Sequence, residues 1–571
     1  GYEITAAIYT SFILMLAFLL LERKELVKLV REHVNRFSLT ALALILIFFL
    51  AFSLLLVSPV EQLYFDENIY QGIAINILRN GNALWCQYGT GDLTHCYVNA
   101  LYHDPVGWSA FIAVAFGIFG IGVSTAYNLE LFAGAASIVV VFLLSSLLVK
   151  RKEFAVISTL AMAMMPQLFI WSRTQADLDL PMMMFAELSF FLFLVFIKRK
   201  SIYSLAAFAF SVDLLSYMRI EAMLLVGVFA VLLVTFGDQE ITATIGERIA
   251  EVRKSIGNNT AVLLVLLVFI VLLVPQLYYI SVEAQNPSYG QSSNESVISM
   301  ANFEKNININ LPFVFGQING VNSYPTAFHY TIVPLAMLGG VLLAFDKKMR
   351  NRFGIIFLLS LWFLSYFIFY TAFYAGSATY GVDSRFMLQL LPAACMLAAF
   401  AILRIGDYAS LLVARHEESH MRKIAFESAI VISSLAFLAY PFTFLIPAVA
   451  IAPNSMPQQS VILKAMNTFY SEYNAVPQNC LVFSFTPDIW FEVNRSSAQI
   501  NYLTGANSTL KSSIKHYSCV VFDYGYWCVV PPYHGSTCRN VVDSFVLENL
   551  TSPAPQLGGD EVAFYRILNY T

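Results

Sequence analysis

The stretch YFDENIYQGIAINILRNG, residues 64–81, places two acidic residues at the start of an amphipathic pattern. Asp66 and Glu67 come directly after a long apolar segment, so we expect them at the edge of a membrane. A helix with one apolar face is predicted from there on, because apolar side chains recur at every fourth position. These side chains are Phe65, Ile69, Ile73 and Ile77. A pair of carboxylates in that position needs a chemical explanation.

The composition of the 571-residue chain is that of a membrane protein. Hydrophobic residues make up 58% of the sequence and charged residues only 12%, and the mean hydropathy is +0.66. These values predict a mainly α-helical, polytopic transmembrane protein and exclude a soluble globular domain. The net charge of −4 and the absence of a long basic tract give no reason to expect a nucleic-acid partner.

The long apolar runs predict about twelve membrane spans. Segment 107–122 is apolar but short and interrupted by glycine, so we expect a re-entrant or interfacial piece there. The predicted spans are 2–22, 39–59, 123–149, 154–171, 180–198, 202–218, 220–236, 260–282, 328–345, 354–374, 386–404 and 424–446.

Basic residues set the expected orientation. The linkers rich in Lys and Arg all fall on one side of these spans, and the positive-inside rule makes that side cytoplasmic. Both termini and the loop of Asp66 are then extracytoplasmic. Five of six Asn-x-Ser/Thr sequons agree with this topology, Asn258 being the exception. The linkers are 22–36, 150–153, 198–201, 237–257, 347–352 and 414–423, and the outer sequons are at Asn294, Asn494, Asn507, Asn549 and Asn569.

Six of the seven cysteines lie in predicted outer segments, and only Cys395 lies in a span. Six outward cysteines suggest disulfides in an oxidising compartment. A zinc site is the alternative, but the sequence has no CxxC spacing, so we favour disulfides. We expect the pairs Cys86–Cys96, Cys480–Cys519 and Cys528–Cys538.

The composition divides the chain into two domains. Residues 1–452 form the predicted transmembrane domain, and residues 453–571 a small extracytoplasmic α/β domain with a helical pattern followed by short apolar runs. These runs are 480–485, 518–525 and 563–568. The polar outer segment 283–327 is either a flexible connector or a lid over a site.

Ionisable residues collect at the outer ends of the predicted spans. Either they converge on one cavity open to lipid, or each is solvated separately by headgroups. We favour convergence, because no comparable set lies buried at the inner ends. Glu130, Glu187 and Asp213 lie within spans and are expected to have structural roles. The outer residues are Asp66, Glu67, Asp92, His95, His103, Asp104, Arg173, Asp177, Asp179, Arg219, Glu221, His329, Asp383 and Arg385.

Such a set of side chains suits a substrate that is part lipid and part phosphate-linked sugar. Guanidinium groups match phosphate oxygens, and a carboxylate can take the proton from an acceptor hydroxyl. Carboxylates also stabilise the oxocarbenium-like state of sugar transfer. A cluster of His, Asp and Glu can hold a divalent metal such as Mg, Mn, Zn or Ca on the phosphate, and we expect His103 and Asp104 as its ligands.

These residues resemble the GT-C superfamily of lipid-phosphate-sugar-dependent glycosyltransferases, in particular its protein O-mannosyltransferase and aminoarabinose-transferase-like branch. The resemblance runs from about residue 39 to 450 and consists of five short motifs in order. They are YFDENIYQGIAINILRNG (64–81), YHDPVGWSAFIAVAFGIFG (102–120), SRTQADLDLPMMMF (172–185), YMRIEAMLL (217–225) and DSRFMLQLLPA (383–393).

The resemblance implies a role for each motif. Asp66 becomes the candidate catalytic base with Glu67 beside it, and His103 and Asp104 take positions that include a metal ligand in the family. Asp104 stands where the family has Lys, and Pro-Val where it has Pro-Pro. The remaining roles are donor-phosphate binding for Arg173, Arg219 and Arg385, and lining of the site for Asp104, Asp179, Glu221 and His329.

The sequence therefore predicts an integral membrane glycosyltransferase, a hexosyl- or pentosyltransferase. It would move a monosaccharide from a polyprenyl- or dolichyl-phosphate donor to a protein, lipid or glycan acceptor on the outer face. An oligosaccharyltransferase is the second hypothesis, although the tail has no Trp-Trp-Asp motif. A lipid or sugar transporter is the third, although polar residues gather at one end and no repeat is visible.

Overall fold

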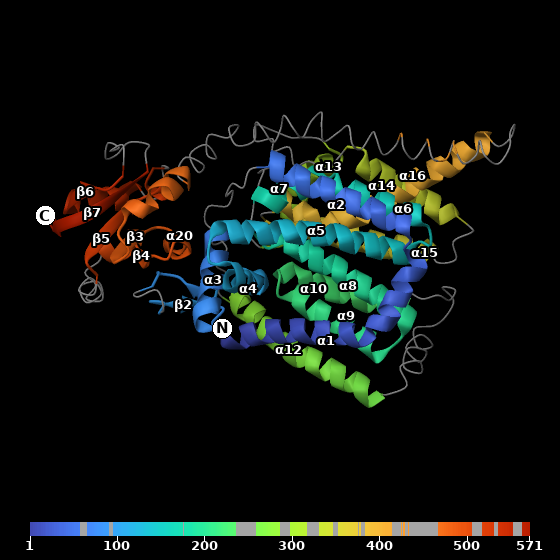
Figure 1. The fold of residues 1–571 in the computed structure, drawn as a ribbon, viewed down its shortest axis with the longest axis horizontal. Helices are drawn as coiled ribbons and strands as arrows, with labels where there is room; N and C mark the ends of the chain where they lie inside the picture. The colour runs from blue at the N-terminus through green and yellow to red at the C-terminus, as the bar shows by residue number, and fades with distance from the viewer. Residues whose placement is uncertain are drawn as a thin grey trace.

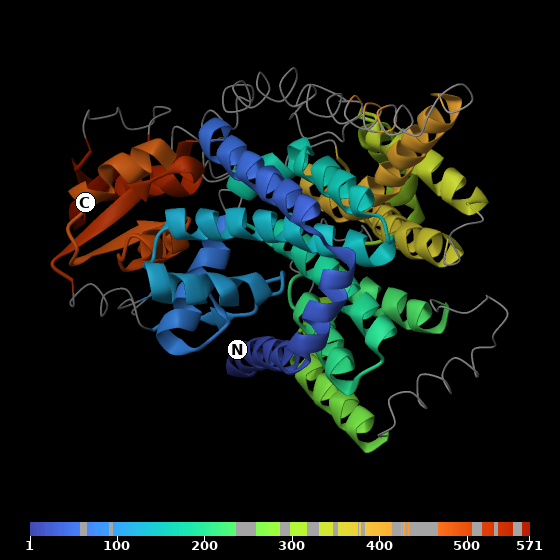
Figure 2. The same ribbon diagram turned by 45° about the vertical axis from the view of Figure 1, so that its right-hand side comes forward.

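The computed structural model shows a helical bundle with a small sheet domain at one end (Figures 1 and 2). It describes residues 1–57, 66–90, 95–174, 176–235, 259–285, 297–316, 330–346, 352–374, 376–378, 383–413, 466–504, 517–529, 535–551 and 562–570, with positions 424, 426, 428 and 432.

Helices and short 3₁₀ turns make up the described part of the bundle. They are α1 (Tyr2–His33), α2 (Arg36–Leu56), α3 (Asp66–Asn80), α4 (Gly107–Phe119), α5 (Val123–Leu148), α6 (Lys152–Ala163), α7 (Pro166–Thr174), α8 (Asp179–Arg199), α9 (Ile202–Ser216), η1 (Ile220–Ala222), α10 (Met223–Thr235), α12 (Asn259–Gln285), α13 (Met300–Val314), α14 (Ile332–Phe345), α15 (Arg352–Ala372), η2 (Asp383–Leu390) and α16 (Leu391–Val413).

Seven of the described helices are long and apolar enough to cross a membrane, so the chain is a multi-pass integral membrane protein. Helices α6 and α7 together form a further apolar segment that is bent by 57°. The predicted spans 202–218, 220–236 and 328–345 are apolar helices of 10–17 residues, and most of 424–446 lies outside the described residues. The number twelve therefore stays a prediction.

Helix α1 differs from its prediction. It does not end near residue 22 but continues to His33, so most of the predicted basic linker 22–36 is helical. One reason is local: this segment is rich in Glu, Lys and Arg, which have high helix propensity. Glu22 and Glu25 on it both contact Arg199 at the end of α8, the former at 3.6 Å.

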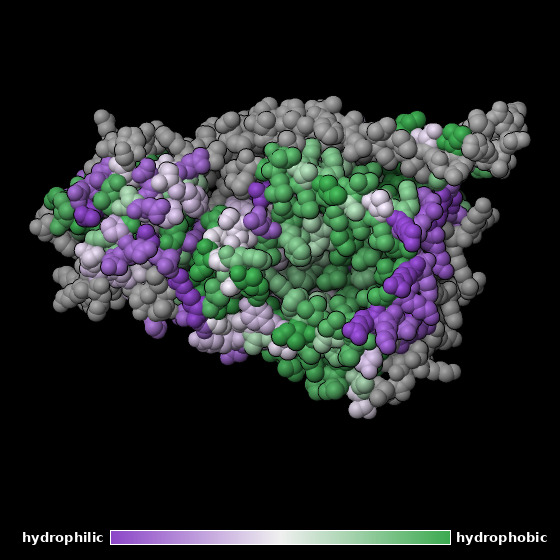
Figure 3. All heavy atoms as spheres, viewed as in Figure 1, coloured by the Kyte–Doolittle hydropathy of each residue, from purple (hydrophilic) through white to green (hydrophobic). Residues whose placement is uncertain are grey.

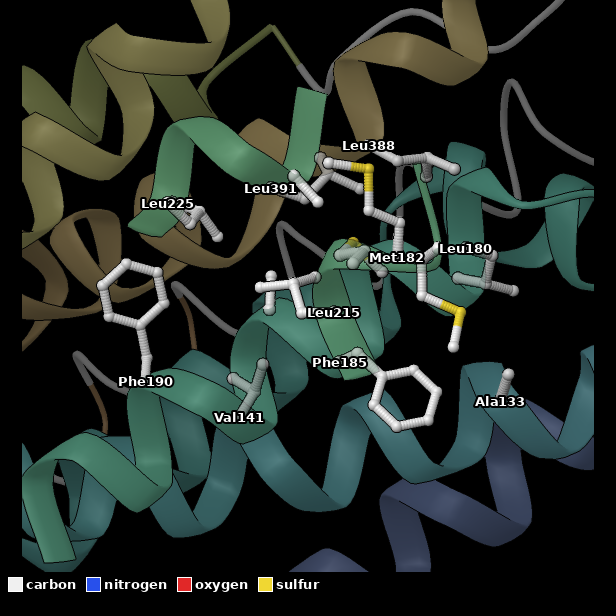
Figure 4. Close-up of a cluster of buried hydrophobic side chains, with 14 of the residues drawn as sticks. Ala133, Val141, Leu180, Met182, Phe185, Phe190, Leu215, Leu225, Leu388 and Leu391 are labelled. Atoms are coloured by element: carbon white, nitrogen blue, oxygen red, sulfur yellow. The ribbon is translucent and has the colours of Figure 1, made fainter. Parts of the chain in front are cut away.

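Apolar side chains from several helical segments pack together in the centre of the bundle (Figure 4). Phe190 of α8 stacks on Trp362 of α15 with ring centroids 4.0 Å apart. This packing fixes the ends of α8, α9, α10 and η2 relative to one another. The labelled side chains are Ala133 and Val141 of α5, Leu180, Met182, Phe185 and Phe190 of α8, Leu215 of α9, Leu225 of α10, Leu388 of η2 and Leu391 of α16.

Charged residues of three predicted cytoplasmic linkers meet at the end of the bundle opposite the sheet domain (Figures 1 and 3). Figure 3 shows hydrophilic residues along that edge and hydrophobic ones over the face between the two ends. Arg199 of linker 198–201 contacts Glu22 and Glu25 of linker 22–36, and residues of linkers 22–36 and 150–153 line one cavity. The linkers thus lie together, as one-sided topology requires.

The C-terminal residues form a five-stranded sheet in the order β4-β3-β5-β7-β6. Strand β3 is parallel to β4 and β5, and β7 is antiparallel to β5 and β6. The predicted strands at 480–485, 518–525 and 563–568 correspond to β3, β5 and β7. The elements are η5 (Tyr473–Ala475), β3 (Cys480–Ser484), α20 (Pro487–Glu492), β4 (Ser497–Gln499), α21 (Asn501–Thr504), β5 (Cys519–Tyr524), α23 (Tyr526–Val529), α24 (Gly535–Ser544), β6 (Phe545–Asn549) and β7 (Ala563–Tyr570).

All three predicted disulfides are present. Cys86–Cys96 lies in the segment between α3 and α4, the first of the predicted outer loops, where the short strands β1 (Trp85–Cys86) and β2 (Asn99–Ala100) pair. Cys480–Cys519 joins β3 to β5, and the third bond closes a turn of the same domain. Cys395 is buried and free.

The first outer loop is joined to the C-terminal sheet through the main chain. The backbone N–H of Thr90 donates to the Ser497 carbonyl at 2.8 Å, and that of Gln499 donates to the Tyr88 carbonyl at 3.1 Å. Residues 88–90 therefore lie against the free edge of β4 like an additional short strand. This pairing could not be predicted from the sequence, because it joins two segments that are far apart along the chain.

Helix α20 packs directly on α3 beside this edge. The Trp85 indole N–H donates to Asp488 Oδ2 at 3.1 Å, and Asn68 Nδ2 donates to Glu492 Oε1 at 3.1 Å. A Cβ atom at Gly72 would lie 2.0 Å from Asp488 Oδ1, so only glycine allows this approach. The C-terminal domain thus contacts the helix that begins with the acid pair.

Candidate active site

Helix α3 presents Asp66 at its first turn. Negative charge is favoured there, because the unpaired N–H groups of a helix N-terminus point toward it. The helix ends at Asn80, and Gly81 follows with φ +69°, the left-handed conformation that ends many helices. The described part of α3 begins at Asp66, and its C-terminal end is where the sequence predicts.

Arg385, at the start of the helical segment that continues as α16, is the centre of the polar cluster. Its Nε lies 3.0 Å from Asp179 Oδ2 and 3.4 Å from Asp177 Oδ2. Its Nη2 lies 4.0 Å from Asp66 Oδ2. One guanidinium therefore joins α3 to the beginning of α8, as the sequence-based hypothesis of convergence requires.

Arg219 extends the cluster to two more segments. Its Nη1 donates to Asp179 Oδ2 at 3.0 Å, and its Nε donates to Glu221 Oε1 at 2.6 Å. The Tyr370 hydroxyl of α15 donates to the same Glu221 oxygen at 2.9 Å. Asp179 is thus shared by two arginines.

An aromatic ring lies between the two arginines. The guanidinium carbons of Arg219 and Arg385 each lie 5.0 Å from the centroid of Phe386, and Tyr370 stacks on Phe386 at 5.2 Å. Cation–π contacts and the shared carboxylate hold two like charges close together. The sequence identified the charged residues but not this ring.

Asp66 is the most accessible carboxylate of the cluster. Its side chain is 25% exposed, whereas those of Asp177 and Asp179 are each 2% exposed. The Tyr102 hydroxyl donates to Asp66 Oδ1 at 2.7 Å. Burial raises the pKa of Asp66 above its usual value, and Arg385 and Tyr102 oppose this by favouring the charged form. Asp66 is therefore an accessible carboxylate with increased basicity.

The other predicted residues of the first outer loop have different surroundings. Glu67 is fully buried and accepts a hydrogen bond from the Tyr127 hydroxyl at 3.0 Å. Asp104 accepts one from the Tyr70 hydroxyl at 2.6 Å, and His103 Nε2 lies 3.6 Å from the same carboxylate. These contacts place the loop beside α3 but bury Glu67 away from solvent.

Arg173 stands apart from the carboxylates. It is 9% exposed, and its Nη1 donates to Asn128 Oδ1 at 3.3 Å. It forms no ion pair with any residue that the structure describes. It lies within electrostatic range of Tyr127, the tyrosine that contacts Glu67. His329 lies outside the described residues, as does Asp92.

The carboxylates expected to be structural are buried within the bundle. Glu187 accepts a hydrogen bond from Ser137 at 2.8 Å, Asp213 accepts one from Ser11, and Glu130 is 1% exposed. Glu187 and Asp213 thus connect neighbouring helices.

The described residues include no cluster of three or more side chains that could hold a divalent cation. His103 and Asp104 contact each other, but no group of three or more His, Cys, Asp or Glu side chains with suitable spacing occurs within the described ranges. Structural metal sites generally need more ligands than a pair. The predicted metal role of His103 and Asp104 therefore gains no support here.

Three residues of the cluster were absent from the sequence-based prediction, namely Tyr70, Tyr102 and Phe386. The sequence offered no signal for them, because aromatic residues are common throughout it. Asp177 was among the outer residues expected to converge, but it was given no role of its own.

Comparison with known proteins yields similar folds rather than similar sequences. No protein-family model matches the chain, and no curated protein matches it in sequence. ArnT, an aminoarabinose transferase, from Cupriavidus metallidurans in the apo state superposes with a TM-score of 0.51 and 13% identity, covering 91% of this chain and 97% of that one. Bound to undecaprenyl phosphate, it gives a TM-score of 0.50 and 12% identity, covering 93% and 98%.

An archaeal oligosaccharyltransferase is also similar. The enzyme from Archaeoglobus fulgidus, tethered with an acceptor peptide containing the NVT sequon, gives a TM-score of 0.51 and 12% identity, covering 91% of this chain and 73% of that one. Both neighbours are GT-C glycosyltransferases. This protein has the GT-C fold. The GT-C fold predicted from the five motifs is thereby confirmed, and it extends over most of the chain.

Proposed function

We propose that this protein transfers a monosaccharide from a polyprenyl-phosphate donor to an acceptor on the extracytoplasmic face of the membrane. The GT-C fold supports the proposal, since one structure with this fold holds undecaprenyl phosphate and another an acceptor peptide. The observation that carries it is the 4.0 Å separation of Asp66 and Arg385. This pairing puts an accessible base next to a group that can bind phosphate.

In the proposed reaction Asp66 accepts the proton of the acceptor hydroxyl while the acceptor oxygen bonds to C1 of the sugar. The bond between C1 and the phosphate oxygen breaks, and the lipid phosphate leaves with that electron pair. Attack from the side opposite the phosphate inverts the configuration at C1. The positive charge that develops on the sugar ring is stabilised by the nearby carboxylates.

The arginines share the binding of the leaving phosphate. Arg173 has no carboxylate partner among the described residues, so its charge is available to the donor. Arg385 Nη1 likewise has no hydrogen-bond partner in the described part of the chain. Arg219 is committed to Asp179 and Glu221, and it acts mainly by holding the position of Asp179.

Asp66 fits the role of base better than Glu67. Glu67 is completely buried beside Tyr127, whereas Asp66 remains partly exposed. We therefore assign proton transfer to Asp66 and positioning of α3 to Glu67. Asp104, Asp179 and Glu221 line the site. The acceptor is a protein, a lipid or a glycan, and the transfer assay distinguishes these classes.

The test is Asp66→Asn, assayed in proteoliposomes with a labelled lipid-phosphate sugar. A general base contributes about 10²–10⁴-fold, so the rate of transfer should fall by that factor while donor binding changes little. Glu3→Gln is the matched control, because it neutralises an exposed carboxylate at the N-terminal end of α1. Full activity of the Asp66→Asn variant contradicts the assignment of the base.

The same vesicles separate the two alternatives. Transfer from a lipid-linked oligosaccharide but not from a lipid-phosphate monosaccharide supports an oligosaccharyltransferase, to which the chain is equally similar in fold. Translocation of the labelled lipid without any transfer supports a transporter.

A further inference from the structure

A basic cavity lies at the end of the bundle opposite the candidate active site. Its volume is about 450 Å³, within the range of small-molecule sites. It is lined by the turn that joins α1 to α2 and by the turn that joins α5 to α6. Figure 3 shows hydrophilic residues over the junction of α1 and α2. The proposed transfer reaction does not use this cavity.

Basic side chains outnumber acidic ones around the cavity. Arg31, His33, Lys150, Arg151 and Lys152 line it, together with two glutamates. Arg151 is neutralised by Asp407 at 2.8 Å and approaches Glu153 at 3.9 Å. Arg31, Lys150 and Lys152 form no ion pair with any of the residues that are described.

The three cations gather around one hollow and are not neutralised there by any residue that the structure describes. Two arginines at the same end do have acidic partners, Arg199 in Glu22 and Glu25, and Arg404 in Asp346 and Asp407. Three positive charges around a single cavity attract an anion to it.

Backbone groups add to this attraction. Helix α6 begins at Lys152, and no side chain caps its N-terminus. By contrast, Asn35 and Ser38 form a complete capping box at the start of α2. The first N–H groups of α6 are thus left for another acceptor, and phosphate oxygens are suitable ones.

The position of the cavity favours a lipid over a free anion. It lies where α1 and α5 end and α2 begins, and all three helices are long enough to span a membrane. On α2, Phe37, Leu39, Leu44 and Ile47 are exposed apolar residues that begin next to the cavity and continue along the helix. Acyl chains can therefore lie on α2 while a headgroup occupies the cavity.

We propose that this cavity binds the phosphate of an anionic phospholipid headgroup from the leaflet on that side of the bundle, the cytoplasmic leaflet by the positive-inside rule. The phosphate contacts Arg31, Lys150 and Lys152 and the N-terminus of α6, and the acyl chains lie along α2. Inorganic phosphate has the same recognition chemistry but lacks the chains, so the two sources differ in affinity.

The test uses the purified full-length protein in detergent and native mass spectrometry. The probes are phosphatidylglycerol, phosphatidylcholine and inorganic phosphate, each titrated separately. We expect phosphatidylglycerol to bind at least about tenfold more tightly than phosphatidylcholine. The assignment to an anionic lipid is overturned if inorganic phosphate binds while phosphatidylglycerol and phosphatidylcholine bind with equal affinity.

The variants locate the site. The triple variant Arg31→Gln, Lys150→Gln, Lys152→Gln should weaken phosphatidylglycerol binding about tenfold or more, and the double variant that retains Arg31 should weaken it less. The matched control is Arg23→Gln, Lys24→Gln, Lys28→Gln, which removes the same charge from α1 outside the cavity. Equal losses in both triple variants, or no loss in the cavity variants, overturn the proposal. If the triple variant does not fold, the double variant decides.

Discussion

The hydrogen bond from Tyr102 to Asp66 gives a prediction about the pH dependence of transfer. The hydroxyl lies 2.7 Å from Asp66 Oδ1 and lowers the pKa of this carboxyl by favouring its charged form. A hydrogen bond to a charged group contributes about 1.5–3 kcal/mol, and Tyr102→Phe removes this stabilisation from the ionised carboxylate. The substitution should therefore raise the pKa of Asp66 further above its usual value.

The sign follows from the role of the base. Only ionised Asp66 can accept a proton, so activity rises with pH through its pKa. In Tyr102→Phe the acidic limb of the kcat/KM profile should move toward higher pH, while the rate on the plateau changes little. The assay measures the initial rate of transfer from a labelled lipid-phosphate sugar from about pH 4 to about pH 9. This range begins near the usual pKa of an Asp carboxyl group and extends well above it.

Tyr70→Phe is the matched control. Tyr70 packs against Tyr102 at a centroid distance of 5.8 Å, but its hydroxyl donates to Asp104 rather than to Asp66. Its loss should leave the acidic limb closer to that of the unmodified protein. A uniform fall in rate for Tyr102→Phe, with no movement of the limb, refutes the link between this hydroxyl and the base.

Two further substitutions test the rest of the site. Arg385→Lys keeps the charge but loses the planar group that joins Asp66, Asp177 and Asp179. The kcat of this variant should fall about 10–100-fold. Arg404→Lys, at the other end of the bundle, is the control and should leave transfer rates unchanged. Gly72→Ala introduces a Cβ atom 2.0 Å from Asp488 Oδ1. It should lower the free energy of unfolding by about 1–3 kcal/mol, as measured by thermal unfolding. Gly340→Ala is the control and should leave the stability unchanged, because no atom lies within 4 Å of the added Cβ. Equal melting temperatures for the two glycine variants would falsify the proposed close contact between α20 and α3.

Features encoded locally were accessible from the sequence. The start of α3 at Asp66 and its end at Gly81 follow from apolar spacing and from glycine, and the strands β3, β5 and β7 follow from short apolar runs between turns. The disulfides followed from the grouping of cysteines in outer segments. Arg219 and Arg385 were recognisable because charge near the end of an apolar span needs a partner.

Features that depend on contacts between distant segments were not accessible. Glu22 and Glu25 contact Arg199, and the sequence does not reveal this pairing, which holds the extended part of α1 against the end of α8. The choice between Asp66 and Glu67 depended on burial, which two adjacent residues of one helix do not reveal. Tyr102 became relevant only because the chain folds back onto α3.

The main-chain pairing of residues 88–90 with β4 has a mechanical consequence. Together with the contact of Gly72 and Asp488, it makes the outer loop, α3 and the C-terminal sheet a single rigid unit. Any shift of α3 during turnover must then displace the whole sheet rather than a side chain alone. A fluorophore on an exposed residue of β6, far from the membrane, should therefore report events at Asp66.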